Sequence, residues 1–82
     1  MNKHVIQLIE FVVSKNRDGF NTFIDFSGHV NLISIRVHKN GWEEGSDADL
    51  NKFVYTREVT PKFVKEMIVE IERLDDIGKQ LL

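Results

Sequence analysis

The fold is decided by residues 20–37, which read FNTFIDFSGHVNLISIRV. Apolar and polar side chains alternate on both sides of Ser27 and Gly28, and a period of two is typical of half-buried β-strands. A two-residue turn at Ser27 and Gly28 would place Phe26 opposite His29 and bring both apolar sets to one face. The stretch therefore predicts an antiparallel hairpin that packs one face against a core.

Two helices are expected, one before and one after the strands. Residues 3–15 repeat apolar side chains at helical spacing, and Asn2 is suited to cap their first turn. Thr60 followed by Pro61 is typical of an N-cap and a first helical position, and apolar residues at helical spacing continue to about Leu74. The pattern predicts one helix ahead of the hairpin and one near the end of the chain.

A third strand is predicted over residues 52–59, with Phe53 and Tyr55 toward the core and Val54 toward solvent. The element order is then helix, strand, strand, strand, helix. We expect a single small α+β domain over residues 1–82, in which two helices cover one face of a three-stranded antiparallel sheet. The other face of the sheet is left open.

The composition is that of a packed domain without disulfide bonds. Hydrophobic residues make up 41% and charged residues 29% of the 82 residues, with one proline and no cysteine. The lack of cysteine excludes disulfides, thiolate metal sites and a cysteine nucleophile, and it fits a reducing compartment. No uncharged apolar run approaches the ~18 residues of a membrane span, and the apolar N-terminal stretch lacks a signal-peptide cleavage site. We therefore expect a cytoplasmic protein without a membrane partner.

Motifs for catalysis or metal binding are weak in this sequence. Asp47, Asp49 and Asn51, with Glu58, copy the spacing of an EF-hand loop, but Lys52 stands where that loop requires glycine. The three histidines lack ligand-like spacing and are expected at the surface or rim. No serine lies in a nucleophile elbow, and no glycine-rich phosphate loop is present. We expect no catalytic residue, no metal and no cofactor, and hence no enzyme.

The net charge of −2 hides two unlike halves of the chain. Residues 1–42 contain five bases and three acids, whereas residues 43–82 contain six bases and ten acids. The predicted connection before the third strand, at about 13 residues, is long for a hairpin loop and typical of a functional one. It carries the only tryptophan and a run of acids: Trp42, Glu43, Glu44, Asp47 and Asp49. We predict that these five residues bind a partner, and the lack of a basic cluster makes direct nucleic-acid binding unfavourable.

The open face of the predicted sheet is a second candidate site. The predicted register places Phe23 opposite Leu32, with Arg36 in a polar rim around them. An apolar centre inside a polar rim is the anatomy of a protein interface. The alternative is that this cross-strand pair only stabilises the hairpin, by about 0.2–1 kcal/mol.

The order of elements and the acidic connection resemble a class of small phage and prophage proteins. This class includes an acidic inhibitor family of Cas9 with helix, three strands and helix in the same order, and the resemblance covers most of the chain. It implies that the acids imitate nucleic-acid charge and occupy a DNA-reading surface. The acids that match this role are Glu43, Glu44, Asp47 and Asp49, extended by Glu70, Glu72, Asp75 and Asp76.

The leading hypothesis for function is a non-enzymatic protein-interaction module, encoded by a phage or another mobile element. It binds a protein partner or itself, as a homodimer, through the open sheet face and the acidic connection. One alternative is an acidic nucleic-acid mimic that inhibits a DNA-binding enzyme. A further alternative is a single-strand RNA platform on the sheet, using Phe23, Arg36, His38 and Lys52.

Overall fold

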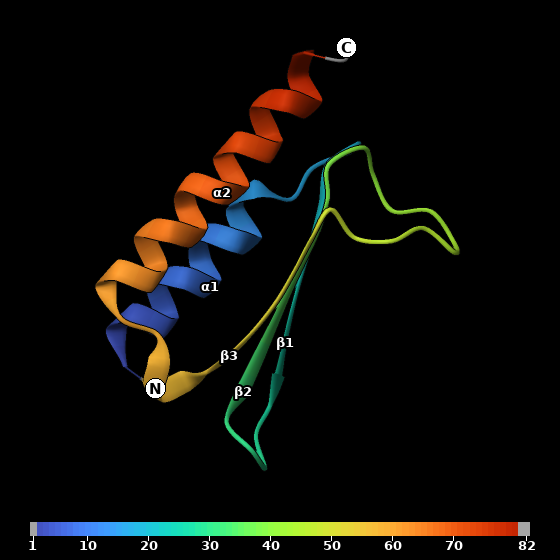
Figure 1. Ribbon diagram of the computed structural model, residues 1–82. Coiled ribbons are helices and arrows are strands. Elements are labelled where there is room, and N and C mark those ends of the chain that lie inside the picture. Colours follow the sequence, from blue (N-terminus) through green and yellow to red (C-terminus); the bar gives the residue numbers. More distant parts are fainter. Residues whose placement is uncertain (1, 81–82) are drawn as a thin grey trace.

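Two helices pack on one face of a three-stranded antiparallel sheet in the computed structural model, which describes residues 2–80 (Figure 1). The sheet order is β1-β2-β3. The elements are α1 (Lys3–Lys15), β1 (Asn21–Ser27), β2 (Leu32–His38), β3 (Leu50–Tyr55), the short 3-10 helix η1 (Thr56–Glu58) and α2 (Pro61–Gln80). The predicted α+β class and the predicted order of elements are confirmed.

Both helices begin where the sequence predicts. The Asn2 side-chain oxygen accepts a hydrogen bond from the Val5 N–H at 2.9 Å, so one of the free donors of the first turn of α1 is satisfied. The Thr60 hydroxyl accepts from the Phe63 N–H at 3.1 Å, and Pro61 occupies the first position of α2, where its missing N–H is not needed. The two predicted N-caps are therefore confirmed.

The predicted end of α2 near Leu74 is wrong, because the helix continues to Gln80. Asp75 directly follows Leu74, and an acidic residue is unfavourable near a helix C-terminus, where the macrodipole is negative. In the structure Asp75 is 3% exposed. It is surrounded by Lys15 at the end of α1, by Arg17 in the connection that follows α1, and by Lys79 one turn further along α2. These three cations compensate the carboxylate, so the helix does not have to end before it.

The turn of the hairpin is longer than predicted. Phe26 lies opposite Ile33 instead of His29, and residues 28–31 form a four-residue connection in place of a two-residue turn. Asn31 has φ of 55°, a left-handed conformation that asparagine tolerates better than most residues, and its carbonyl accepts the Thr56 N–H at 2.8 Å. The register shift is an even number of residues, so the predicted faces of both strands are preserved.

The third strand is shifted and turned over relative to the prediction. β3 begins at Leu50 and ends at Tyr55, where η1 takes over. Val54 is 7% exposed on the core side, whereas Phe53 and Tyr55 lie on the other side of the sheet, so their predicted inward orientation was wrong. The prediction carried the alternation through to Val59, but η1 interrupts the period of two. Val59 is buried, but it lies beyond η1, so its burial does not indicate which side of β3 faces the core.

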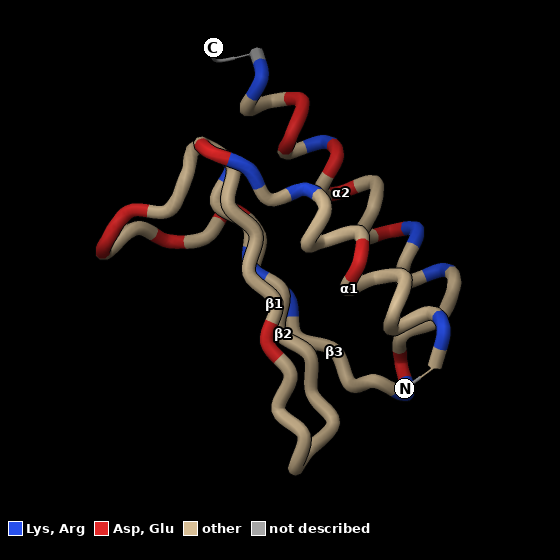
Figure 2. Tube along the Cα trace, turned by 180° about the vertical axis from the view of Figure 1, so that it is seen from behind, with Lys and Arg blue, Asp and Glu red and all other residues tan. Residues whose placement is uncertain are grey.

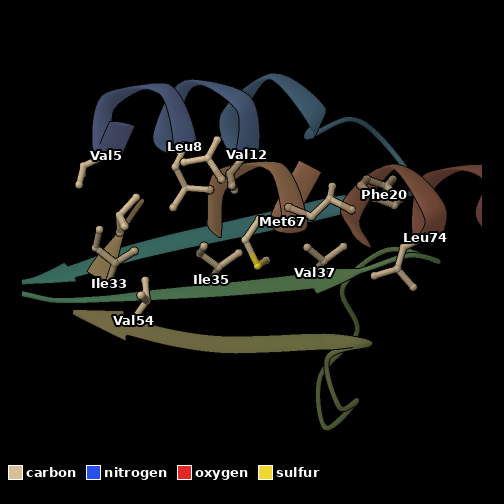
Figure 3. Packing of buried hydrophobic residues seen from close by; sticks show 13 residues of the cluster. Val5, Leu8, Val12, Phe20, Ile33, Ile35, Val37, Val54, Met67 and Leu74 are labelled. Atoms are coloured by element: carbon tan, nitrogen blue, oxygen red, sulfur yellow. The ribbon is translucent and has the colours of Figure 1, made fainter. Parts of the chain in front are cut away.

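The core fills the space between the sheet and the two helices (Figure 3). Both helices and the inner sides of β2 and β3 contribute buried residues. One further buried residue precedes β1 and another precedes α2. The buried residues are Val5, Leu8, Val12, Phe20, Ile33, Ile35, Val37, Val54, Val59, Val64, Met67, Ile71 and Leu74. A Cβ on Gly78 would lie 3.0 Å from the Lys39 carbonyl oxygen, so glycine permits the close approach of α2 to the end of β2.

Candidate functional site

The side of the sheet away from the helices carries a group of partly exposed apolar and aromatic side chains, which we call the open face. It consists of Phe23, Leu32, Arg36, Phe53 and Tyr55, one or two from each strand. Phe53 is 60% exposed and Tyr55 is 40% exposed. Within residues 2–80, both helices lie on the opposite side of the sheet (Figure 3). The open face therefore offers aromatic surface to a binding partner.

Two arginines lie against the aromatic rings of this side of the sheet. The Arg36 guanidinium carbon is 4.8 Å from the Phe23 ring centroid, and the Arg57 guanidinium carbon is 4.6 Å from that of Tyr55. Asp25 orients Arg36 through an ion pair at 3.7 Å. Arginine and aromatic residues are both enriched at protein interfaces, and an arginine stacked on an aromatic ring adds cation–π attraction to a broad contact area.

The predicted cross-strand pair of Phe23 and Leu32 is wrong, because of the longer hairpin turn. Phe23 lies opposite Arg36, and Leu32 lies between Ser27 of β1 and Tyr55 of β3. The predicted residues Phe23, Leu32 and Arg36 nevertheless share the open face.

Phe53 and Tyr55 were not among the predicted site residues. Both alternating sets of the third strand contain apolar residues, so the alternation alone does not decide between them. Beginning the strand at Leu50 would have placed Leu50 and Val54 together on the core side. A strand that starts at Leu50 would therefore have predicted Phe53 and Tyr55 on the open face.

The connection between β2 and β3 borders the open face. This segment, residues 40–49, is called the acidic loop here. It projects to the side of the sheet opposite the helices, as both Figure 1 and Figure 3 show. Trp42 is 53% exposed, and its backbone N–H donates to the Asn21 side-chain oxygen at 2.7 Å, which fixes the loop to β1. The Ser46 hydroxyl donates to the Glu43 carbonyl oxygen at 2.7 Å, which closes the tip.

The four predicted acids of the loop are not equivalent. The Asp49 carboxylate accepts the Lys39 backbone N–H at 2.8 Å and lies 3.6 Å from the Lys39 ammonium, so its charge is already compensated. Glu43, Glu44 and Asp47 are exposed, and the described residues provide them with no ion-pair partner. Figure 2 shows these acids along the loop with no basic residue at its tip. The loop thus presents three uncompensated negative charges.

The predicted extension of the acidic surface onto α2 is largely cancelled by neighbouring bases. Arg73 forms an ion pair with Glu70, and the hydrogen bond from Arg73 lowers the pKa of Glu70. Burial raises the pKa of Asp75, but the close approach of Arg17 and the charges of Lys79 and Lys15 outweigh burial and lower it overall. Glu72 lies 4.0 Å from Lys15 Nζ, whereas Asp76 is exposed and forms no ion pair among the described residues, so one of the four predicted acids of α2 keeps an uncompensated charge.

A hollow of about 340 Å³ lies between the end of β2 and the acidic loop. It is lined by His38, Asn40, Gly41, Glu43, Ser46, Asp47 and Asp49. His38 was expected at the surface or rim, but it is 4% exposed, and the Phe23 ring contacts it edge to face at a centroid distance of 5.7 Å. The Phe23 ring packs against the imidazole and contributes to its burial.

Metal-binding clusters and membrane-spanning helices are both absent from the residues that the structure describes. Across residues 2–80, no three histidine or acidic side chains lie in a group that would hold a metal ion. None of the helices in this part of the chain has the length and apolar composition needed to cross a membrane.

No protein-family model, curated protein or solved structure matches the chain.

Proposed function

We propose that the protein is a non-enzymatic interaction module, and that it binds a second protein through the open face and the acidic loop together. One observation carries the proposal. The face of the sheet that carries the exposed aromatic side chains is turned away from both helices, and the loop that carries the uncompensated acids projects to the same side (Figures 1 and 3). The two surfaces can therefore contact a single partner at once.

The composition of the surface favours a protein over a nucleic acid. Tyrosine, phenylalanine, tryptophan and arginine are enriched at the centres of protein interfaces, and Phe53, Tyr55, Trp42 and Arg36 supply all four types here. Phosphate groups would approach the three uncompensated acids of the loop, which repel them. The surface fits a partner with an apolar patch next to a group of basic residues.

The experiment starts from affinity capture in the host and identification of the retained protein, followed by calorimetric titration with that purified partner. Phe53→Ser should weaken binding by about tenfold or more, since a central aromatic contact contributes about 2 kcal/mol. Phe26→Ser is the matched control, because Phe26 is 47% exposed but belongs to the other set of β1 side chains, opposite Ile33.

Equal affinities of the Phe53 and Phe26 variants would refute the assignment of the open face. Binding of single-stranded oligonucleotides that is lost in Phe53→Ser would assign the face to nucleic acid instead. Sedimentation of a dimer that Phe53→Ser converts to a monomer would identify a second copy of the chain as the partner.

A second candidate, an acidic mimic that blocks a nucleic-acid-binding enzyme, is favoured by the uncompensated charges of Glu43, Glu44 and Asp47. In this version the loop alone dominates binding, and affinity for a basic partner falls steeply with salt. Replacing all three acids with lysine should then abolish binding, while Phe53→Ser has little effect. The opposite ranking of the two variants would exclude the mimic.

A further inference from the structure

We infer that the hollow between β2 and the acidic loop receives an arginine side chain of the protein partner. The inference rests on the proposed function, because it specifies the chemistry of the partner at one point of the same surface. The hollow is lined by His38 and by loop residues whose side chains carry oxygen atoms, among them Glu43, Ser46 and Asp47.

The state of His38 is the first observation that points to a ligand. Its side chain is 4% exposed, yet in the part of the chain that the structure describes no group forms a hydrogen bond with the ring. Its ring nitrogens are also not sealed off from solvent in the way that the unpaired Asp75 oxygen is. A buried polar ring normally has a hydrogen-bond partner. His38 lines the hollow, so a group that enters there can form a hydrogen bond with the ring.

The charge of the lining is the second observation, and it fixes the sign of the ligand. Glu43 and Asp47 have no basic partner among the described residues, whereas the Asp49 carboxylate is held by Lys39. The bases nearest in sequence, Lys39 and Lys52, lie outside the set of lining residues. A cation that enters the hollow therefore meets uncompensated carboxylates.

The kind of cation follows from the size of the hollow and the number of its acceptors. A volume of about 340 Å³ far exceeds the roughly 30 Å³ of one water molecule. The acids are not grouped closely enough to ligate a metal ion within residues 2–80. A guanidinium group carries five N–H donors in one plane and can bond several separated acceptors at once, whereas a lysine ammonium acts as a compact point charge. Arginine is therefore the side chain that fits.

The position of the hollow connects it to the open face. His38 belongs to the same outward set of β2 as Arg36 and Leu32, and Phe23 of the open face packs against its ring. A protein that covers Phe23 and Phe53 would thus bring its edge to the mouth of the hollow. The arginine would lie at the rim of that interface, next to the apolar contact.

The test uses the full-length protein labelled with ¹⁵N and three blocked tripeptides, Gly-Arg-Gly, Gly-Lys-Gly and Gly-citrulline-Gly. The arginine peptide should shift the amide signals of His38, Glu43, Ser46 and Asp47 at millimolar concentration, and the uncharged citrulline peptide should not. The double variant Glu43→Gln with Asp47→Asn should weaken binding of the arginine peptide by roughly three- to tenfold, which is the range expected for the loss of two partly exposed charge pairs. All substituted residues are exposed, so the fold is retained.

Glu44→Gln is the matched control, because it removes the same charge from the same loop but does not line the hollow. Equal weakening by Glu44→Gln and Glu43→Gln would overturn the inference in favour of diffuse attraction. Equal binding of the lysine peptide, saturable shifts of the same amides by CaCl₂, or no shift with any peptide would each overturn it as well. Titration of the identified partner separates the two proposals. If Phe53→Ser weakens binding of the partner but Glu43→Gln with Asp47→Asn does not, the arginine site is refuted and the proposed function is retained.

Discussion

Replacing Asp75 with asparagine removes the negative charge at the centre of an ionic cluster that joins the two helices. The Asp75 carboxylate lies 2.5 Å from Arg17 Nη2 and 3.5 Å from both Lys15 Nζ and Lys79 Nζ. The contact with Arg17 is an ion pair and not a well-aligned hydrogen bond, since the Asp75 oxygen lacks a geometrically acceptable donor. The cluster therefore acts mainly through charge.

The expected loss of stability lies between the values for surface and buried ion pairs. The Asp75 side chain is 5% exposed, but its partners Lys15, Arg17 and Lys79 are 26%, 39% and 60% exposed and regain water when the charge is removed. Exposed pairs contribute about 0–1 kcal/mol, and disrupting buried pairs costs about 3–5 kcal/mol. We expect Asp75→Asn to lower the free energy of unfolding by about 1–2 kcal/mol, and each kcal/mol to lower Tm by about 4–8 °C in a domain of this size.

Urea denaturation at several pH values tests this prediction, with the exposed neighbour Asp76 replaced in the control variant Asp76→Asn. The pKa of Asp75 is lowered in the folded protein, so its stabilisation is fully present above the unfolded pKa of about 3.9 and is lost as pH falls through the folded pKa. The difference between wild type and Asp75→Asn should therefore be present at neutral pH and vanish in strong acid. A difference that persists in strong acid, or an equal effect of Asp76→Asn, would refute the ionic explanation.

Four further substitutions test the orientation of β3, the cap of α2 and the anchoring of the acidic loop. Val54→Ser should destabilise the protein by about 1–3 kcal/mol, while Phe53→Ser should change stability by less than about 0.5 kcal/mol, as measured by urea midpoints. Thr60→Ala should cost about 1 kcal/mol through the lost cap of α2, and an unchanged thermal midpoint would contradict that role. Asn21→Ala should increase acrylamide quenching of Trp42 fluorescence, because it removes the hydrogen bond that holds the base of the acidic loop; quenching that stays the same would show that the loop is held by other contacts.

The sequence predicts the layers of this fold because local signals agree with each other. The apolar spacing and the cap residues Asn2 and Thr60 define where the helices begin, and the alternation around Ser27 defines two strands with a common core face. The exact register is not encoded as clearly. A turn that is two residues longer preserves every face, so the pattern of apolar residues cannot distinguish the two turns.

The parts of the candidate site that depend on tertiary contacts were predicted less well. The compensation of Asp75 comes from Lys15 and Arg17, which are distant in sequence, and no local pattern indicates that pairing. The orientation of β3 follows from its pairing with β2, since both sets of side chains in that strand contain apolar residues. The burial of His38 involves a contact with Phe23 on the neighbouring strand, whereas the predicted register placed Phe23 opposite Leu32.

Cross-saturation NMR with the identified partner is the most direct test of the central claim that the open face and the acidic loop form one binding surface. Irradiation of the partner should attenuate signals of Leu32, Phe53 and Tyr55 and of residues 40–49, while signals from the outward side of α2, such as Val69, keep their intensity. Attenuation confined to residues 40–49 would leave only the loop as a binding site. Attenuation at Val69 with none on the sheet would contradict the account.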